Sequence, residues 1–142
     1  MRLRAARARG GGRLGTGHRR ARPDGGTFAD AVRAVPDAGA LVLADVATEA
    51  EARNAEHAGA DAVATTLAGH TADRARTAGP DLALVAAVAA QVSLPVIAEG
   101  RYHRPADAAA AITAGAHAVV VGTAITVPSW LTTSFRRALP AR

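Results

Sequence analysis

The sequence contains no cysteine, no lysine and very few aromatic residues: two phenylalanines, one tryptophan and one tyrosine. Without cysteine the chain can form neither a disulfide nor a thiolate metal site, which suits the reducing cytoplasm where we expect it. No apolar run approaches the roughly 18 residues that a membrane-spanning helix needs, so we expect no membrane partner. Hydrophobic residues still make up 49% of the chain, mostly alanine and valine. We therefore expect a core of small aliphatic side chains.

Positive charge is concentrated at the N-terminal end. All 17 basic residues are arginines, and eight of them form a low-complexity segment with glycine and alanine: Arg2, Arg4, Arg7, Arg9, Arg13, Arg19, Arg20 and Arg22. From Asp24 onward the acids outnumber the arginines. We interpret residues 1–19 as a disordered arm and residues 20–142 as one domain. An arginine arm can bind nucleic acid by neutralising phosphates, but this one lacks interleaved aromatics and helical periodicity. We expect no nucleic-acid partner, and RNA binding by the arm remains an alternative.

The rest of the chain alternates short apolar runs with helical segments. Two self-similar pieces, residues 58–63 and 114–119, mark equivalent turns from a helix into a strand. Such alternation predicts an α/β fold with parallel strands joined by helical crossovers. The predicted strands are Ala40–Asp45, expected to be buried on both faces, Ala62–Thr66, Leu94–Ala98 and Ala118–Val121. The predicted helices are Phe28–Ala38, a segment from the capping box Thr48–Glu51 to Gly59, Asp81–Gln91, Pro105–Gly115 and Pro128–Leu139.

Four strand–helix units amount to half of a (β/α)8 barrel, which needs about 200–250 residues. In such barrels the working residues lie at the carboxyl ends of the strands, and those ends here hold Asp45, Thr66, Glu99 and Gly122. Asp45 could instead cap a helix. Glu99 follows an apolar strand, where an unpaired charge is costly. Gly100 and Gly122 end the last two strands, whose loops often hold a phosphate through backbone N–H groups.

Five segments occur in an order and at a spacing that resemble the N-acylmannosamine-6-phosphate 2-epimerase family. The resemblance covers about residues 20–139 and implies strands five to eight of a ribulose-phosphate-binding type of TIM barrel. The segments are Leu43–Thr48, Thr65–Thr71, Gly79–Leu82, Pro95–Arg101 and Ala116–Thr126, and residues 22–25 match a loop that precedes them.

The resemblance implies an activity and a set of site residues. Family members interconvert the 6-phosphates of N-acetylmannosamine and N-acetylglucosamine, in sialic acid catabolism, without a metal or an organic cofactor. They use a lysine and a glutamate as a two-base pair, because one group removes the C2 proton and another returns one to the opposite face. The resemblance makes Glu99 the catalytic glutamate. It assigns contacts with the phosphorylated amino sugar to Asp45, Thr66, Gly100, Arg101, Gly122 and Thr123, although Arg101 could equally form a structural ion pair.

The sequence also departs from the family. The catalytic lysine belongs to the first half of the barrel, and this chain has no lysine. His70 replaces a tyrosine, Thr123 replaces a glycine, and Val127 replaces an arginine near the phosphate. We therefore expect the chain to be inactive alone, and to need the missing N-terminal half-barrel or a homo-oligomer. The alternative function is a non-catalytic phosphosugar-binding protein. We expect His57, His103 and His117 to be structural.

Overall fold

The four predicted strands form one parallel sheet. The computed structural model describes residues 25–34 and 41–140, so the predicted arm, residues 1–19, lies outside the described residues, as do residues 35–38 of the first predicted helix. The strands are β1 (Leu43–Asp45), β2 (Ala62–Ala64), β3 (Val96–Glu99) and β4 (Ala118–Val120). Their order is β1-β2-β3-β4, and every pair is parallel. The prediction of four sequential parallel strands is confirmed.

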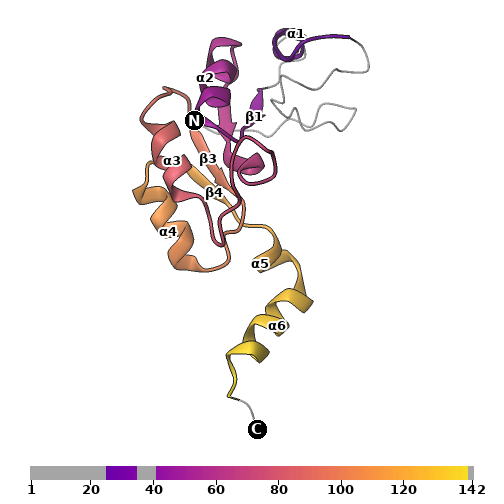
Figure 1. The fold of residues 1–142 in the computed structure, drawn as a ribbon, viewed down its shortest axis with the longest axis vertical. Helices are drawn as coiled ribbons and strands as arrows, with labels where there is room; N and C mark the ends of the chain where they lie inside the picture. The colour runs from indigo at the N-terminus through magenta and orange to yellow at the C-terminus, as the bar shows by residue number, and fades with distance from the viewer. Residues whose placement is uncertain (1–24, 35–40, 141–142) are drawn as a thin grey trace.

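Three helices cover one face of this sheet. They are α2 (Glu49–His57), α3 (Leu82–Ala89) and α4 (Pro105–Thr113), and each contacts the strand that follows it in the sequence (Figure 1). Ahead of them lies α1 (Phe28–Ala34), and a 3₁₀ turn, η2 (Thr65–Leu67), follows β2 directly. At the C-terminal end, α5 (Thr123–Thr126) and α6 (Pro128–Ala138) stand away from the sheet (Figure 1). None of the helices in the described part of the chain is long and apolar enough to cross a membrane.

The start of α2 shows why the chain becomes helical there. Thr48 has an extended backbone, and its hydroxyl accepts a hydrogen bond from the N–H of Glu51 at 3.2 Å, as the predicted capping box requires. The carboxylate of Glu51 reaches one residue further back than that motif expects and accepts from the N–H of Ala47. At the other end, Gly59 has a φ of +91°, which favours glycine, and the chain reverses there towards β2.

The strand register separates the two faces of the sheet. Ala44, Val63 and Ala98 face the helices and are fully buried. Side chains alternate along a strand, so Leu43, Asp45, Ile97, Glu99 and Val120 all belong to the opposite face. The helix face carries the core, which extends from α1 through α4 in two adjacent clusters.

The face opposite the helices is only partly covered. Leu43, on the edge strand β1, is 45% exposed, and Val120, on the edge strand β4, is 41% exposed. The expectation that the first strand is buried on both faces is therefore wrong, because no described element packs over its second face at Leu43. In a closed barrel this face would be the interior, filled by side chains from all eight strands. The four strands described here supply half of such an interior.

Candidate functional site

Three side chains meet at the carboxyl ends of three neighbouring strands. Asp45 ends β1, Thr66 lies in η2 just after β2, and Glu99 ends β3. The hydroxyl oxygen of Thr66 lies 2.7 Å from Asp45 Oδ1 and 3.1 Å from Glu99 Oε2. Asp45 is almost fully buried, whereas Thr66 and Glu99 are partly exposed. The structure thus brings together three of the residues that the sequence places in a substrate site.

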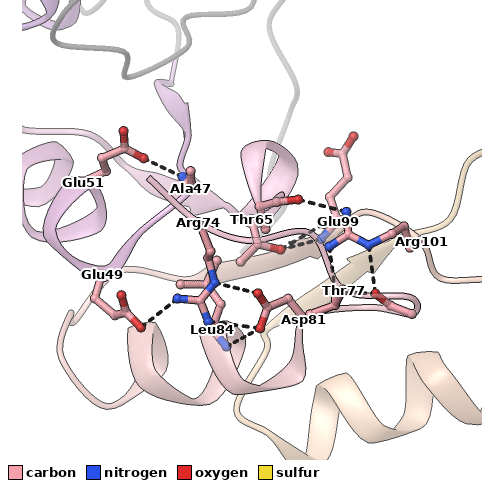
Figure 2. Close-up of polar contacts among 12 residues, drawn as sticks. Ala47, Glu49, Glu51, Thr65, Arg74, Thr77, Asp81, Leu84, Glu99 and Arg101 are labelled. Carbon is pink, nitrogen blue, oxygen red and sulfur yellow. Dashed lines mark hydrogen bonds and ion pairs between the residues drawn. The ribbon is translucent and has the colours of Figure 1, made fainter. Parts of the chain in front are cut away.

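The 3₁₀ turn after β2 also fixes the backbone of Glu99. Thr65 is buried, and its hydroxyl donates to the carbonyl oxygen of Glu99 and accepts from the N–H of Glu99, each at 3.0 Å (Figure 2). The two consecutive threonines therefore contact different parts of Glu99. Thr65 binds the main chain of Glu99, and Thr66 contacts its carboxylate.

The residues predicted to bind phosphate follow β3 and β4, which are neighbours in the sheet. Gly100 has a φ of +110°, a conformation that side chains rarely adopt. A Cβ built on Gly100 or on Gly122 would meet no atom within 4 Å among the described residues other than its chain neighbours, so the backbone there leaves room for a ligand atom to approach. Thr123 begins the short α5 and is exposed. Phosphate binding by these three residues stays a prediction.

Arg101 contacts the protein's own backbone. It has a φ of +62°, and its guanidinium donates to the carbonyl oxygens of Gly79 and Ala68, both at 2.8 Å, and to Thr77 Oγ1 at 3.0 Å (Figure 2). These bonds fasten the long loop between η2 and α3 to the end of β3. The sequence offered a phosphate contact or an ion pair for this residue, and the loop carbonyls are a third kind of partner. A substrate contact for Arg101 stays a prediction.

A second arginine, Arg74, also holds this loop, through two carboxylates, and sequence reasoning missed it. Arg74 donates to both carboxylate oxygens of Asp81, at 2.6 and 3.1 Å, and to Glu49 at 3.2 Å (Figure 2). The bonds from Arg74 hold the pKa of Asp81 below its ordinary value, against the opposing effect of burial. Asp81 also caps α3 by accepting from the N–H of Leu84 at 3.0 Å. The available signal was the N-cap aspartate itself, which sequence reasoning used only as a helix boundary.

The histidines lie outside this group of carboxylates and threonines. His70, which stands where the family has a tyrosine, is exposed in the loop after η2. His103 lies against Trp130 of α6, with ring centroids 4.8 Å apart. Among the described residues, no three histidine or acidic side chains are grouped so that they could hold a metal ion.

Comparison with known proteins agrees with the motif resemblance. Residues 15–141 match the family model NanE, described as "Putative N-acetylmannosamine-6-phosphate epimerase". A Corynebacterium glutamicum protein named as the corresponding 2-epimerase is 47% identical over 119 residues, which are 82% of this chain and 50% of that protein. A Cutibacterium acnes protein of the same name is 44% identical over 126 residues, or 87% of this chain and 55% of that protein.

A solved structure extends the likeness to three dimensions. The N-acetylmannosamine-6-phosphate 2-epimerase from Clostridium perfringens is 38% identical and superimposes with a TM-score of 0.78, over 83% of this chain and 52% of that one. The chain therefore spans about half the length of the relatives that it matches. The four-stranded parallel sheet with its helices is part of that enzyme's barrel fold.

Proposed function

The chain belongs to the N-acetylmannosamine-6-phosphate epimerase family, and on this basis we propose that it forms half of an enzyme that interconverts the 6-phosphates of N-acetylmannosamine and N-acetylglucosamine. The observation that carries the proposal is the convergence of Asp45, Thr66 and Glu99 at the carboxyl ends of adjacent parallel strands. This is the end of a barrel where substrates bind.

The chemistry explains why a glutamate suits this place. In the open-chain sugar, the aldehyde acidifies the neighbouring C2 hydrogen, so a side-chain base can remove it as a proton. Inversion at C2 then requires a second group that delivers a proton to the opposite face. Glu99 is suited to one of these steps, because Thr65 fixes its main chain and its carboxylate lies at the rim of the sheet. Asp45, buried beside it, is suited to positioning the sugar or the second group.

The second group has to come from outside this chain's sheet. The sequence contains no lysine, and His70, which stands where the family has a tyrosine, is exposed in the loop after η2. The partner we propose is a complementary half-barrel of the same family, whose strands would close over the face that carries Asp45, Glu99, Leu43 and Val120. That face is partly open, and the relatives contain about as much chain again as is matched here.

The packing of the helices supports a docking place for the proposed partner beside β4. Each of α2, α3 and α4 contacts the strand that follows it, but the described residues contain no strand after α6. No residue of α6 is buried. Four apolar side chains of α6 and its two flanking residues recur four positions apart and are exposed, and we refer to them as the α6 stripe: Val127, Leu131, Phe135 and Leu139. The same packing rule would seat the α6 stripe on a strand added beside β4, as the first strand of the complementary half.

Complementation tests the proposal directly. The partner would be the half of the Corynebacterium glutamicum relative that this chain does not match, expressed separately and mixed with the 142-residue chain. Deuterium incorporation at C2 of N-acetylmannosamine 6-phosphate, followed by NMR, detects proton exchange even without net conversion. We expect exchange only from the mixture. Binding of the sugar phosphate without exchange in an assembled mixture would favour the non-catalytic phosphosugar-binding alternative, and failure to assemble would contradict the half-barrel proposal.

A further inference from the structure

The hydroxyl of Thr66 lies between two carboxylates but carries a single hydrogen. It is within hydrogen-bonding distance of Asp45 Oδ1 at 2.7 Å and of Glu99 Oε2 at 3.1 Å. One hydrogen can make one good bond, and an ionised carboxylate has no hydrogen to give in return. The shorter contact therefore takes the hydrogen, so Thr66 donates to Asp45 when both carboxylates are ionised. The oxygen atoms of Thr66 and Glu99 then face each other with no hydrogen between them.

Both contacts become hydrogen bonds when Glu99 carries one proton. A protonated carboxyl has an O–H donor, and a threonine oxygen that is already donating still has lone pairs to accept with. The chain of bonds would run from Glu99 through Thr66 to Asp45, with every hydrogen used once. The state in which Glu99 holds a proton is the state it enters when it removes a proton from the substrate.

We propose that Thr66 is a positioning residue that stabilises Glu99 as it takes up the sugar's C2 proton, by accepting a hydrogen bond from the newly protonated carboxyl while donating to Asp45. The proposal rests on the epimerase function given above. The C–H bond at C2 breaks, its electron pair stays on the sugar as an enolate, and the proton moves to Glu99. The second group, from the complementary half, then gives its own proton to the opposite face of C2, and the enolate becomes the epimer. The proton on Glu99 returns to that group through solvent before the next turnover, and in the reverse reaction Glu99 is the group that delivers the proton. Thr66 keeps its own hydrogen throughout.

The pattern of bonds at the two threonines supports this role over a purely structural one. Threonine hydroxyls commonly bond to nearby backbone groups, and Thr65 does so by binding the main chain of Glu99. The hydroxyl of Thr66 contacts two carboxylates instead, from the strands on either side of β2. An interaction that is complete only after proton transfer lowers the barrier without tightening substrate binding. It should therefore affect kcat more than KM.

Kinetics of the assembled pair of half-barrels give the first test. Thr66→Val removes the hydroxyl at nearly constant volume, and we expect kcat to fall about 3- to 10-fold, the loss that corresponds to one hydrogen bond between uncharged groups, with KM changed by less than about twofold. Thr66→Ser keeps the hydroxyl and should recover most of the loss. A rise in KM at constant kcat would overturn the proposal in favour of simple substrate binding. Equal losses in the valine and serine variants would overturn it as well.

A second test needs no activity and separates this inference from the proposed function. Glu99→Gln supplies an N–H donor where the protonated carboxyl would have its O–H, so it imitates the protonated state in the 142-residue chain. In each background we measure the change in melting temperature that Glu99→Gln causes. We expect this change to be more stabilising by about 4 °C or more in the Thr66→Ser background than in the Thr66→Val background. Thr66→Ala replaces Thr66→Val if the latter does not fold. Equal shifts in the two backgrounds would overturn the proposal, whether or not the assembled pair turns over substrate.

Discussion

The side chain of Thr65 is hydrogen-bonded to both backbone polar groups of Glu99, its hydroxyl lying 3.0 Å from the carbonyl oxygen and 3.0 Å from the amide nitrogen. The two residues are 34 positions apart, so this contact joins the ends of two strands. It also means that one buried hydroxyl determines where the main chain leaves β3 and turns into Gly100. The position of the proposed catalytic carboxylate therefore depends on a residue that would not itself touch a substrate.

Thr65→Val should loosen the end of β3 while leaving the volume of the side chain nearly unchanged. It would leave the N–H and C=O of Glu99 without this partner, and an unsatisfied buried group costs about 1–3 kcal/mol. We expect faster hydrogen exchange at the amide of Glu99, measured by NMR or mass spectrometry, and a lower denaturant midpoint. Thr65→Ser should cost less than the valine change. Unchanged exchange at Glu99 in the valine variant would contradict the role given to Thr65.

The Arg74–Asp81 pair predicts sensitivity to acid. Because Arg74 lowers the pKa of Asp81 in the folded chain, the ionised form stabilises the fold at pH values above the ordinary aspartate pKa of about 3.9, and this contribution is lost as pH falls through the lowered value. Asp81→Asn should therefore be less stable than the parent chain at pH 7. The difference in stability between the two should shrink at low pH. Denaturant midpoints measured between pH 7 and pH 2 check this. A gap that stays constant with pH would contradict it.

Tyr102 offers a direct spectroscopic test of the helix face. It is the only tyrosine in the chain, it is 3% exposed, and burial raises its pKa to about 12. The neutral ring therefore stabilises the fold fully below the ordinary tyrosine pKa of about 10, and this contribution is lost as pH rises towards 12. Ultraviolet titration should show no phenolate until well above pH 10. A midpoint near 10 in the folded chain would show that the ring is not buried.

Within the part of the chain that the structure describes, the hydroxyl of Tyr102 is also buried without a hydrogen-bond partner. Removing such a group relieves the cost of taking it out of water, so Tyr102→Phe should leave stability unchanged or raise it by about 1 kcal/mol. Loss of stability on this change would indicate that the hydroxyl has a partner in solution.

Much of the fold was predictable from the sequence because each unit has local signals. The apolar runs, the cap at Thr48 and the glycine at position 59 each predict the structure of the residues around them. The structure confirms four parallel strands in sequential order. The exposure of Leu43 was not predictable in this way. An apolar run looks the same in a central strand and in an edge strand, because the difference lies in what packs against it.

The site was predictable in outline but not in its contacts. Strand-end position alone groups Asp45, Thr66 and Glu99, since the carboxyl ends of parallel strands share one edge of the sheet. The partners of Arg101 depend instead on how a long loop folds back, and its carbonyl contacts at Gly79 and Ala68 join segments with no regular spacing. The different partners of Thr65 and Thr66 could not be predicted from the sequence either, because they follow from the 3₁₀ turn that places the two hydroxyls differently.

The open edges and the α6 stripe predict how the chain behaves alone. Unpaired strand edges and exposed apolar side chains favour association, so we expect the purified chain to be oligomeric or poorly soluble. A monodisperse monomer with a cooperative melt, measured by sedimentation and calorimetry, would contradict this. The double change Leu131→Ser and Phe135→Ser should weaken assembly with the complementary half. Its matched control, Thr132→Ser and Arg136→Ser, places serines with the same spacing on another side of α6 and should assemble normally.

The final prediction concerns the roles of the two carboxylates in the assembled pair. Removing one of two groups that transfer a proton costs about 10²–10⁴-fold, because the remaining group cannot act on the other face of C2. Glu99→Gln should therefore abolish deuterium incorporation at C2, whereas Asp45→Asn should reduce it less, since the proposed role of Asp45 is to accept from Thr66 and to position the sugar or the second group. Both variants should still assemble, which sedimentation checks. Robust deuterium incorporation by the 142-residue chain alone would contradict this prediction, because a substitute base would then have to act. His70 would be the first residue to mutate in search of that base.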